Sequence, residues 1–463
     1  MSEMNVCTEV VEHDLCSGCG VCASICPQKT LAMQWNTYGE YIAVNQYGRC
    51  SKKCKICLQV CPFAPDVENE DAISRKLFAD IPGIQHHNET GYYFQSYMGY
   101  SKIYNHRLNG ASGGLTTWTL EALLRGKKVD YAVCVSSNPE RDKLFKYVVC
   151  SKPEQVRACA KSCYYPVEMS EVISQILTQE GRYAVVGLPC FVKALRLAMK
   201  INGILKRRIR YVLGIVCGQQ KGKYFAEYCA ALKGVSPRRL VSVHFREKDE
   251  SRPAHDYGMK YFFSDDQGLL QNGVVYWSEG MGKAWLNEYF KINACNYCDD
   301  IFAELADIVF MDAWLPEYKN DWRGTNLVIA RSFEIQKLLE KGQANKEIVL
   351  IPVLVDSVVQ SQAGGIKNKR VILSKRLTYA ADHQWQVPPK RVQPSRLGIL
   401  SRLHLTIETA TIQQSKVIFL ALKNKGDFNT HEFSKKMKKT VWGAKLAIKV
   451  VRKLLHIKQK IGI

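Results

Sequence analysis

The sequence has no long apolar run. Nowhere in its 463 residues is there a stretch of the roughly 18 apolar residues that a membrane-spanning helix needs, so we expect no transmembrane segment. The N-terminal residues MSEMNVCTEVVEHDLC have neither a basic start nor an apolar core, which argues against a signal peptide. We therefore expect a cytoplasmic protein whose cysteines stay reduced and bind metal rather than form disulfides.

The sequence also lacks the signature of a nucleic-acid-binding domain. It has no zinc-finger, aromatic RNA-binding or helix-turn-helix pattern, although its net charge is +22. Acidic residues are missing from the C-terminal end, because none follows Glu432, while ten Lys or Arg residues lie between Lys435 and the last residue. We expect no nucleic-acid partner, so the basic tail needs another explanation.

Cysteine is abundant, with eighteen residues, and eight of them form two runs near the N-terminus. The first run has the C-x2-C-x2-C-x3-C-P spacing of a two-cluster bacterial ferredoxin, and the second has one extra residue in its first gap. Zinc ribbons use paired C-x2-C knuckles instead, so the runs predict two [4Fe–4S] clusters. The runs are Cys16, Cys19, Cys22 and Cys26 before Pro27, and Cys50, Cys54, Cys57 and Cys61 before Pro62.

The ligands of each cluster follow from the ferredoxin pattern, in which the last cysteine of each run binds the other cluster. One cluster is expected on Cys16, Cys19, Cys22 and Cys61, and the other on Cys50, Cys54, Cys57 and Cys26. Cys7 fits neither set, and we expect a free or packed thiol there.

The rest of the chain predicts an α+β protein in which this ferredoxin-like domain precedes a mixed α/β core and a basic helical tail. Short β-branched runs that alternate with helical segments indicate the core. The expected domains are 1–65, a linker at 66–91, the core at 92–375 and the tail at 376–463. The expected buried strands are Asp130–Ser137, Arg182–Cys190, Arg210–Gly218 and Leu305–Trp314.

Four core cysteines occur at predicted strand ends or in a tight pair. Cys190 and Cys217 end strands, and Cys295 and Cys298 form a C-x2-C pair. Together they are sufficient for a third [4Fe–4S] cluster, but buried free cysteines also act as small hydrophobic residues, so spacing alone leaves both interpretations open. Five other core cysteines lack such a setting and are expected to be ordinary core residues: Cys134, Cys150, Cys159, Cys163 and Cys229.

Two further motifs have a functional and a structural interpretation. The segment NGASGGLTTW places Ser112, Gly113, Gly114 and Thr116 at the start of a helix. In the functional interpretation, the backbone N–H groups there attract phosphate. In the structural one, the glycines only make a turn and cap. Lys161 in AKSCYYP and Arg246 in FREK lie beside aromatic residues. They are candidates to tune a flavin or orient an anionic substrate, or they are structural.

The tail has apolar residues at helical spacing, with basic residues mainly on the other side. Basic amphipathic helices lie on anionic membranes, and they also pack on their own protein with a solvated lysine face. The first alternative predicts a peripheral protein at the inner face of the membrane. The apolar residues are Leu446, Val450, Leu454, Ile457 and Ile461, and the basic ones are Lys445, Lys449, Arg452, Lys453, His456 and Lys460.

The order of these motifs resembles one family, the beta subunits of coenzyme F420-reducing hydrogenases and dehydrogenases, which includes the plant 7-hydroxymethyl chlorophyll a reductase. The resemblance covers about Cys16 to Ser332 and rests on the ferredoxin run followed by SGGLTT, KSCYY, GLPC, CG, FREK and CNYCDDIFAELADIVFMDAW. It implies FAD, bound by Ser112, Gly113, Gly114 and Thr116, and a third [4Fe–4S] cluster near it.

The same resemblance implies an FAD-dependent oxidoreductase. It would pass electrons from an external ferredoxin or other redox partner through its clusters and FAD to an organic acceptor, either an F420-like deazaflavin or a biosynthetic intermediate. Two alternatives stay open: an electron-transfer subunit without its own substrate, and an accessory protein of surface polysaccharide biosynthesis. Cys163, Phe191 and Met311 depart from the family pattern near the expected flavin and put the acceptor in doubt more than the fold.

Overall fold

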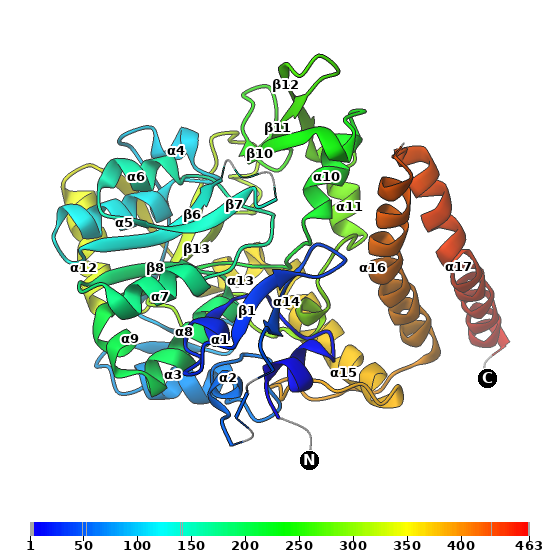
Figure 1. Ribbon diagram of the computed structural model, residues 1–463, viewed down its shortest axis with the longest axis horizontal. Coiled ribbons are helices and arrows are strands. Elements are labelled where there is room, and N and C mark those ends of the chain that lie inside the picture. Colours follow the sequence, from blue (N-terminus) through cyan, green and yellow to red (C-terminus); the bar gives the residue numbers. More distant parts are fainter. Residues whose placement is uncertain are drawn as a thin grey trace.

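A mixed eight-stranded sheet forms the centre of the protein (Figure 1). The computed structural model describes residues 4–48, 50–51, 53–138, 140, 142–426 and 428–461. The strand order is β15-β5-β14-β13-β9-β8-β6-β7. In chain order the strands are β5 (Gln95–Ser101), β6 (Tyr131–Ser137), β7 (Phe145–Cys150), β8 (Tyr183–Gly187), β9 (Ile209–Ile215), β13 (Ile308–Asp312), β14 (Asn326–Ala330) and β15 (Ile348–Val353).

The four central strands, β13, β9, β8 and β6, are parallel to one another, and the remaining pairs are antiparallel. β6, β8 and β13 lie within three of the segments that the sequence predicts as buried strands, and β9 begins one residue before the fourth, Arg210–Gly218. Parallel strands are covered on both faces, which is why they read as continuous apolar runs. Because they share one direction, their carboxyl ends meet at one edge of the sheet.

Helices cover both faces of the sheet. One face packs against α7 (Ser170–Thr178), α8 (Pro189–Ile201) and the N-terminal cysteine-rich segment. The other face packs against α5 (Leu115–Arg125), α6 (Pro153–Ala158) and α12 (Phe333–Ala344). The remaining core helices are α4 (His106–Asn109), α9 (Gly203–Arg208), α10 (Tyr224–Ala231), α11 (Met281–Leu286), α13 (Val355–Ser361) and α14 (Ala363–Ile366), with the π-helix η5 (Lys367–Ile372).

The N-terminal segment is a small module built around the cysteine runs. Its elements are the π-helix η1 (Cys7–Val11), α1 (Val21–Ser24), the hairpin of β1 (Leu31–Trp35) and β2 (Tyr41–Asn45), and α2 (Ile56–Gln59). The module is joined to the core by the Met169 N–H group, which donates to the Cys19 carbonyl oxygen at 2.9 Å, just before α7. The expected α+β organisation is confirmed.

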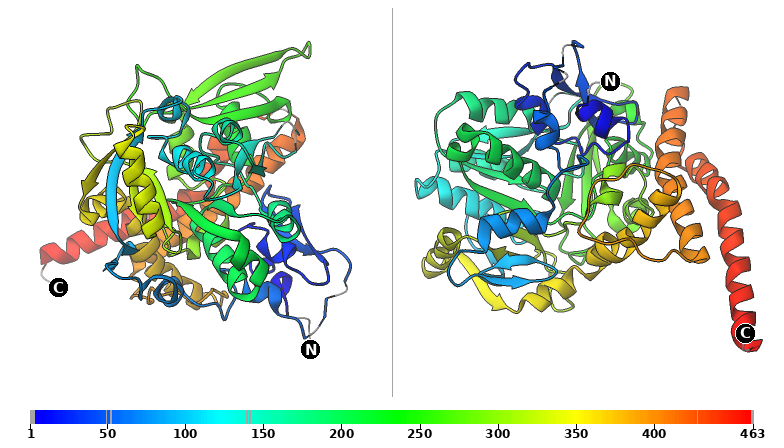
Figure 2. Two further views of the ribbon diagram at one scale, coloured as in Figure 1. Left: turned by 90° about the vertical axis from the view of Figure 1, so that its left-hand side faces the viewer. Right: turned by 90° about the horizontal axis from the view of Figure 1, so that it is seen from below.

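The predicted linker contains α3 (Glu70–Phe78) and leads into a ribbon of β3 (Gln85–His87) and β4 (Gly91–Tyr93). A separate antiparallel sheet of β10 (Leu240–Glu247), β11 (Gly258–Ser264) and β12 (Leu270–Tyr276) projects from the core (Figure 2). The short 3-10 turns are η2 (Pro237–Arg239), η3 (Trp277–Glu279) and η4 (Asn293–Tyr297).

The C-terminal tail is helical, as expected. The boundary predicted at 375/376 falls inside α15 (Leu373–Asp382), whose Leu373, Leu377 and Ala380 belong to the main core. After α15, α16 (Ile399–Lys425) and α17 (Thr430–Ile461) form a hairpin along one side of the molecule, which we call the C-terminal arm (Figures 1 and 2). No helix in the described part of the chain is long and apolar enough to cross a membrane.

Candidate functional site

A cavity of about 780 Å³ opens at the carboxyl ends of the four parallel strands. Val135 on β6 and Asp312 on β13 line it, together with Leu188 after β8 and Cys217 after β9. Ligands of open α/β sheets bind at this edge, outside the carboxyl ends of the strands. A cavity of this size is in the range of cofactor and substrate sites.

The four core cysteines that the sequence singles out converge beside this cavity. Cys190 lies in the first turn of α8, Cys217 follows β9, Cys295 lies in η4 and Cys298 directly follows η4. Burial raises the pKa of the Cys190 thiol, and the charges of Cys298, Cys217 and Cys295 raise it further. Cysteines up to more than a hundred positions apart in the sequence are therefore close enough in the structure for their charges to interact.

Two polar residues contact these thiols. The backbone N–H of Gln220 donates to the Cys295 Sγ atom at 3.2 Å, and its side-chain amide donates to the Cys190 Sγ atom at 3.5 Å. The Lys369 ammonium on η5 donates to the Cys298 Sγ atom at 3.0 Å. Burial alone would lower the pKa of Lys369, but the surrounding cysteines outweigh it and raise that pKa above its usual value. These contacts place hydrogen-bond donors and a cation beside the sulfur atoms.

This environment fits a [4Fe–4S] cluster. Such a cluster is held by four cysteine thiolates, and hydrogen bonds to the sulfurs together with net charge set its potential. Four converging thiols, an amide N–H and a buried cation supply these features. A π-helix such as η5 often marks a functional site, and it was not predicted from the sequence.

The N-terminal cysteines gather as well. Burial raises the pKa of Cys22 well above its usual value, and the charges of Cys19, Cys16, Cys61 and Cys57 add to this effect. The first three of these and Cys22 are expected to hold one cluster, and Cys57 belongs to the other expected set.

For the second N-terminal set, the contacts bring only some of the four cysteines close together. The pKa of Cys57 is raised by burial and by the charges of Cys50 and Cys54. The Cys26 Sγ atom lies 3.6 Å from the Thr30 hydroxyl. Cys7 lies close to the N-terminal set too, since burial and the charge of Cys57 raise its pKa to about 11.

The N-terminal module and the core cysteines are linked by an electrostatic effect and by hydrogen bonds. The charge of Cys19 contributes to the raised pKa of Cys190, whose largest cause is burial. The Gln220 side-chain amide, which donates to Cys190, also donates to the Ser17 carbonyl oxygen at 3.5 Å. Cys217 of the core set lines the cavity. The core thiols are thus linked to the N-terminal module through Cys190 and Gln220 and border the cavity at Cys217.

The glycine-containing segment before α5 borders the cavity through Ser112, Gly114 and Thr116. Its glycines are needed for packing. At Gly114, φ is +78° and an added Cβ would lie 2.4 Å from the His106 carbonyl carbon, while one on Gly113 would lie 2.6 Å from the Gly99 oxygen. The Ser112 hydroxyl donates to the Thr325 carbonyl oxygen at 2.7 Å. The segment is closely packed against backbone, and Ser112, Gly114 and Thr116 border the cavity.

Lys161 and Arg246 both line the cavity, and both have backbone φ angles in the left-handed region, 97° and 62°. Such conformations are uncommon in residues other than glycine and gather at functional sites. Lys161 forms an ion pair with Glu247. Arg246 is buried and lies 2.7 Å from the Asp312 carboxylate, and it also donates to the Ala111 carbonyl oxygen at 2.9 Å.

Asp312 and Lys248 are site residues that the motifs did not single out. Burial would lower the pKa of Arg246, but the Asp312 carboxylate outweighs it and keeps the guanidinium charged. The Lys248 ammonium donates to the Ser112 carbonyl oxygen at 2.8 Å and also contacts the carbonyl oxygens of Arg107 and Arg323. Burial lowers the pKa of Lys248 to about 7. Two basic side chains, Arg246 and Lys248, therefore donate to the backbone of the glycine-containing segment.

The cavity fits an aromatic cofactor with an anionic part. Aromatic side chains form part of the cavity wall: Tyr164, Tyr257, Trp277 and Trp285. The guanidinium carbon of Arg246 lies 4.0 Å from the centroid of the Tyr257 ring. Buried flat side chains with a few placed cations are typical of pockets that hold large planar ligands.

Three family models match the chain. The model described as coenzyme F420 hydrogenase/dehydrogenase, beta subunit N-term, matches residues 96–174, and the corresponding C-terminus model matches residues 180–354. A 4Fe-4S binding domain matches residues 9–31. The 4Fe-4S match covers the first cysteine run and ends before the second, and the two beta-subunit matches cover the sheet from residue 96 onward.

Two curated proteins are similar over most of the chain. A subunit of the F(420)H(2) dehydrogenase of Methanosarcina mazei is 24% identical over 354 residues, 74% of this chain and 87% of that protein. The coenzyme F420-dependent sulfite reductase of Methanocaldococcus jannaschii is 25% identical over 317 residues, 65% of this chain but only 42% of that protein. Among solved structures, a chain of the F420-reducing [NiFe] hydrogenase complex from Methanosarcina barkeri matches 64% of this chain and 96% of its own length, with 15% identity and a TM-score of 0.48.

Proposed function

Because this chain belongs to the coenzyme F420 hydrogenase/dehydrogenase beta subunit family, we propose that it is an iron–sulfur flavoprotein oxidoreductase that exchanges electrons between a redox protein and an organic acceptor. The observation that carries the proposal is that the core thiols are linked to the N-terminal module through Cys190 and Gln220 and border the cavity at Cys217. A deazaflavin such as F420 is the proposed acceptor, since both similar curated proteins carry F420 in their names.

The residues that would hold the groups are those already described. The N-terminal runs would hold two [4Fe–4S] clusters, and Cys190, Cys217, Cys295 and Cys298 a third. FAD would lie in the cavity against Gly114 and Thr116, and when bound it would supply the exchange between one-electron and hydride chemistry. Gln220 and Lys369 stabilise the charged form of the core thiols.

Lys161 and Arg246 have different proposed roles. Arg246 is a positioning residue, because its hydrogen bonds go to Asp312 and to the Ala111 carbonyl oxygen. Lys161, which is about a quarter exposed and has Glu247 as its ion-pair partner, is the better candidate to contact an anionic ligand directly. The Glu247 carboxylate keeps the Lys161 ammonium at the cavity wall.

The proposed redox partner is an external ferredoxin or a larger complex. Several N-terminal cysteines are only half-buried, including Cys16, Cys26, Cys50 and Cys54, which suits electron exchange at this surface. One similar protein is named as part of a dehydrogenase with several subunits, and this favours a function within a complex. An electron-transfer subunit is therefore the second candidate function.

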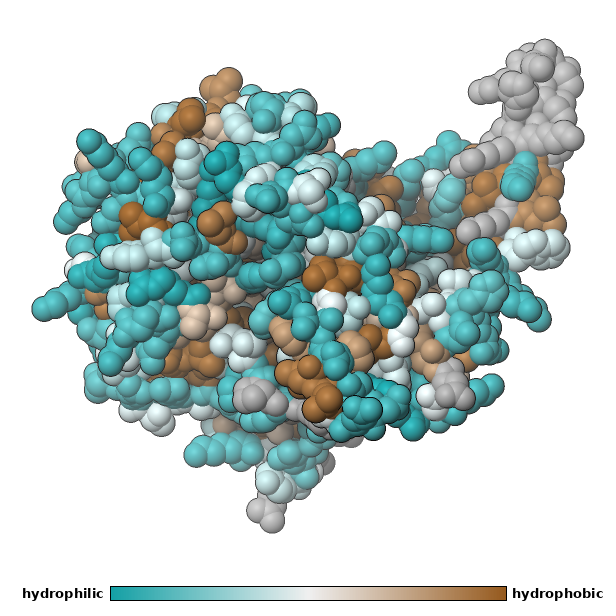
Figure 3. All heavy atoms as spheres, turned by 90° about the horizontal axis from the view of Figure 1, so that it is seen from above, coloured by the Kyte–Doolittle hydropathy of each residue, from teal (hydrophilic) through white to brown (hydrophobic). Residues whose placement is uncertain are grey.

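We further propose that the C-terminal arm lies on an anionic membrane at the cytoplasmic face. On α17, Trp442, Leu446 and Val450 are exposed at helical spacing, next to a run of lysines (Figure 3). Phe433 and Met437 pack inward instead, so the start of α17 is fixed to the protein. The predicted tail side chains from Arg452 onward, and that of Lys445, lie outside the described residues.

The function is tested with anaerobically reconstituted protein. Ferredoxin reduced in advance should bleach bound FAD, and added F420 should then be reduced. A protein that binds FAD and accepts electrons but leaves F420 oxidised would favour the electron-transfer subunit, whereas absence of any bound or reconstitutable FAD would contradict the flavoprotein proposal.

A further inference from the structure

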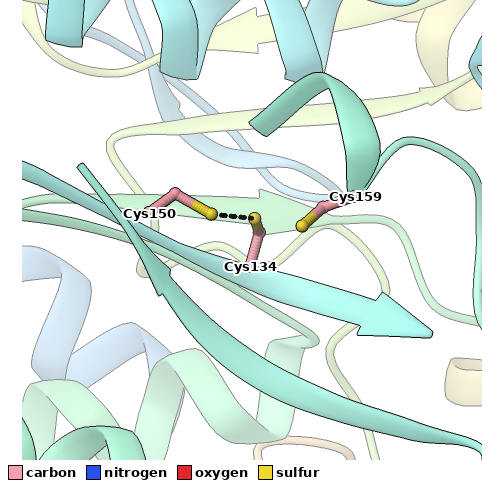
Figure 4. Close-up of side chains that lie close together, drawn as sticks. All are labelled: Cys134, Cys150 and Cys159. Atoms are coloured by element: carbon pink, nitrogen blue, oxygen red, sulfur yellow. Dashed lines mark hydrogen bonds between the residues drawn. The ribbon is translucent and has the colours of Figure 1, made fainter. Parts of the chain in front are cut away.

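Three cysteines outside the predicted ligand sets lie together at the cavity wall (Figure 4). Cys134 lies on β6, Cys150 ends β7 and Cys159 follows α6. Their Sγ atoms all lie within 4.8 Å of one another, and those of Cys134 and Cys150 are 4.0 Å apart. In the described part of the chain, this is the one group of Cys, His, Asp or Glu residues with the spacing of a single-ion site. The sequence predicted ordinary core residues here.

The fold explains the convergence. In the antiparallel pair, Cys134 lies opposite Val148 and Cys150 lies opposite Ala132, so the two cysteines are diagonal neighbours on one face. Helix α6 packs on that face, and Cys159 follows its last residue. Cys134 and Cys150 are buried, Cys159 is half-buried, and Cys134 and Cys159 line the cavity.

The spacing suits a metal ion better than a disulfide. Two thiolates bound to one tetrahedral zinc at about 2.3 Å lie roughly 3.8 Å apart. The observed separation of 4.0 Å is close to that value. Diagonal neighbours on antiparallel strands have Cα atoms about 7–8 Å apart, beyond the usual disulfide range of about 4.4–6.8 Å. A disulfide would need backbone movement, whereas a zinc ion needs only small side-chain adjustments.

Metal binding to cysteine requires thiolates and releases the thiol protons, so zinc uptake by these three residues would depend on pH.

We propose that Cys134, Cys150 and Cys159 bind a zinc ion whose fourth coordination position faces the cavity. Structural zinc sites use four protein ligands, whereas three protein ligands and one open position are typical of sites that bind water or a substrate oxygen. The ion would therefore give the cavity a Lewis-acidic point on the wall formed by β6 and α6. This inference stands on the three cysteines and does not depend on FAD or on the proposed acceptor.

Zinc content of the iron-loaded protein tests the site. Protein purified anaerobically with full iron content is incubated with Zn²⁺, desalted and analysed for both metals. The wild type should retain about one zinc per chain, bound by three sulfurs at about 2.3 Å in zinc X-ray absorption. Cys134→Ser, Cys150→Ser and Cys159→Ser should each lose at least nine-tenths of this zinc with iron unchanged. Cys229→Ser, a buried cysteine on α10, is the matched control and should keep it.

Retention of zinc by all three triad variants, or absence of zinc from the wild type, would overturn the proposal. A second measurement needs no variant. Zn²⁺ should slow alkylation of Cys159 in the wild type at least tenfold, and a chelator should restore the rate; an alkylation rate that Zn²⁺ does not change would also overturn it.

Discussion

The Nζ atom of Lys369 lies 3.0 Å from the Sγ atom of Cys298. The same ammonium donates to the Asp300 carbonyl oxygen at 2.7 Å, and the side chain is buried. The Asp300 carbonyl oxygen, two residues after Cys298, therefore holds Lys369 in place beside the core cysteines. A fixed buried cation at this position is a means of setting the potential of a metal centre.

Replacement of this cation should change the core potential. Lys369→Met should lower the midpoint potential of the core cluster by at least about 60 mV, the one-electron equivalent of a tenfold change in equilibrium constant, because the positive charge favours the more negative reduced state. Redox titration followed by electron paramagnetic resonance measures this value. Lys367→Met, an exposed lysine on the same π-helix, should leave it unchanged, and equal potentials in both variants would refute this function of Lys369.

Arg246 should control flavin binding through the backbone it holds. Arg246→Leu removes the hydrogen bonds to Asp312 and Ala111, so FAD affinity should fall at least tenfold while iron content stays the same. Arg239→Leu changes an exposed arginine that precedes the same small sheet and serves as the control. Equilibrium dialysis with FAD gives both values. Unchanged affinity in Arg246→Leu would mean that the glycine-containing segment does not contact the flavin.

The N-terminal ligand sets predict different iron losses. Cys61→Ser should remove the cluster expected on Cys16, Cys19 and Cys22, a loss of about four irons per chain. Cys7→Ala should lose none, since Cys7 lies near Cys57 but is not needed as a ligand. Iron and acid-labile sulfide analysis measures both. A loss of about four irons in Cys7→Ala would show that Cys7, and not Cys26, completes the second set.

The C-terminal arm should confer membrane binding. A chain truncated after Asn429 lacks α17 and should lose most of its sedimentation with anionic liposomes. Trp442→Gln with Leu446→Gln should reduce binding without changing the net charge. High salt should weaken binding of the full chain, because the lysines act through screened charge. Equal sedimentation of the full and truncated chains would exclude the arm.

The sequence was sufficient for the parts of the fold that depend on local pattern. The four central strands were predicted as buried strands, because strands buried on both faces are continuous apolar runs, and the structure shows that they are parallel. The core cysteines were found because strand ends and a C-x2-C pair are visible as spacing. The predicted boundary at 375/376 falls inside α15, because the sequence pattern alone does not show that this helix packs in the core.

The missed residues depend on contacts that spacing does not encode. Lys369 lies 71 residues after Cys298, and only the packing of η5 brings it to the thiol. Cys134 and Cys150 meet through the register of two strands, and Cys159 joins them because α6 folds back over them. For the glycines before α5, the sequence left a phosphate site and a turn and cap open, and the structure adds that both Gly113 and Gly114 are closely packed against backbone.

The iron content of the Cys295→Ser/Cys298→Ser double variant tests the central claim most directly. Anaerobically purified wild type should contain about twelve irons per chain, and the double variant about eight, because only the core cluster is lost. The same iron content in both proteins would contradict a metal centre at the four core cysteines.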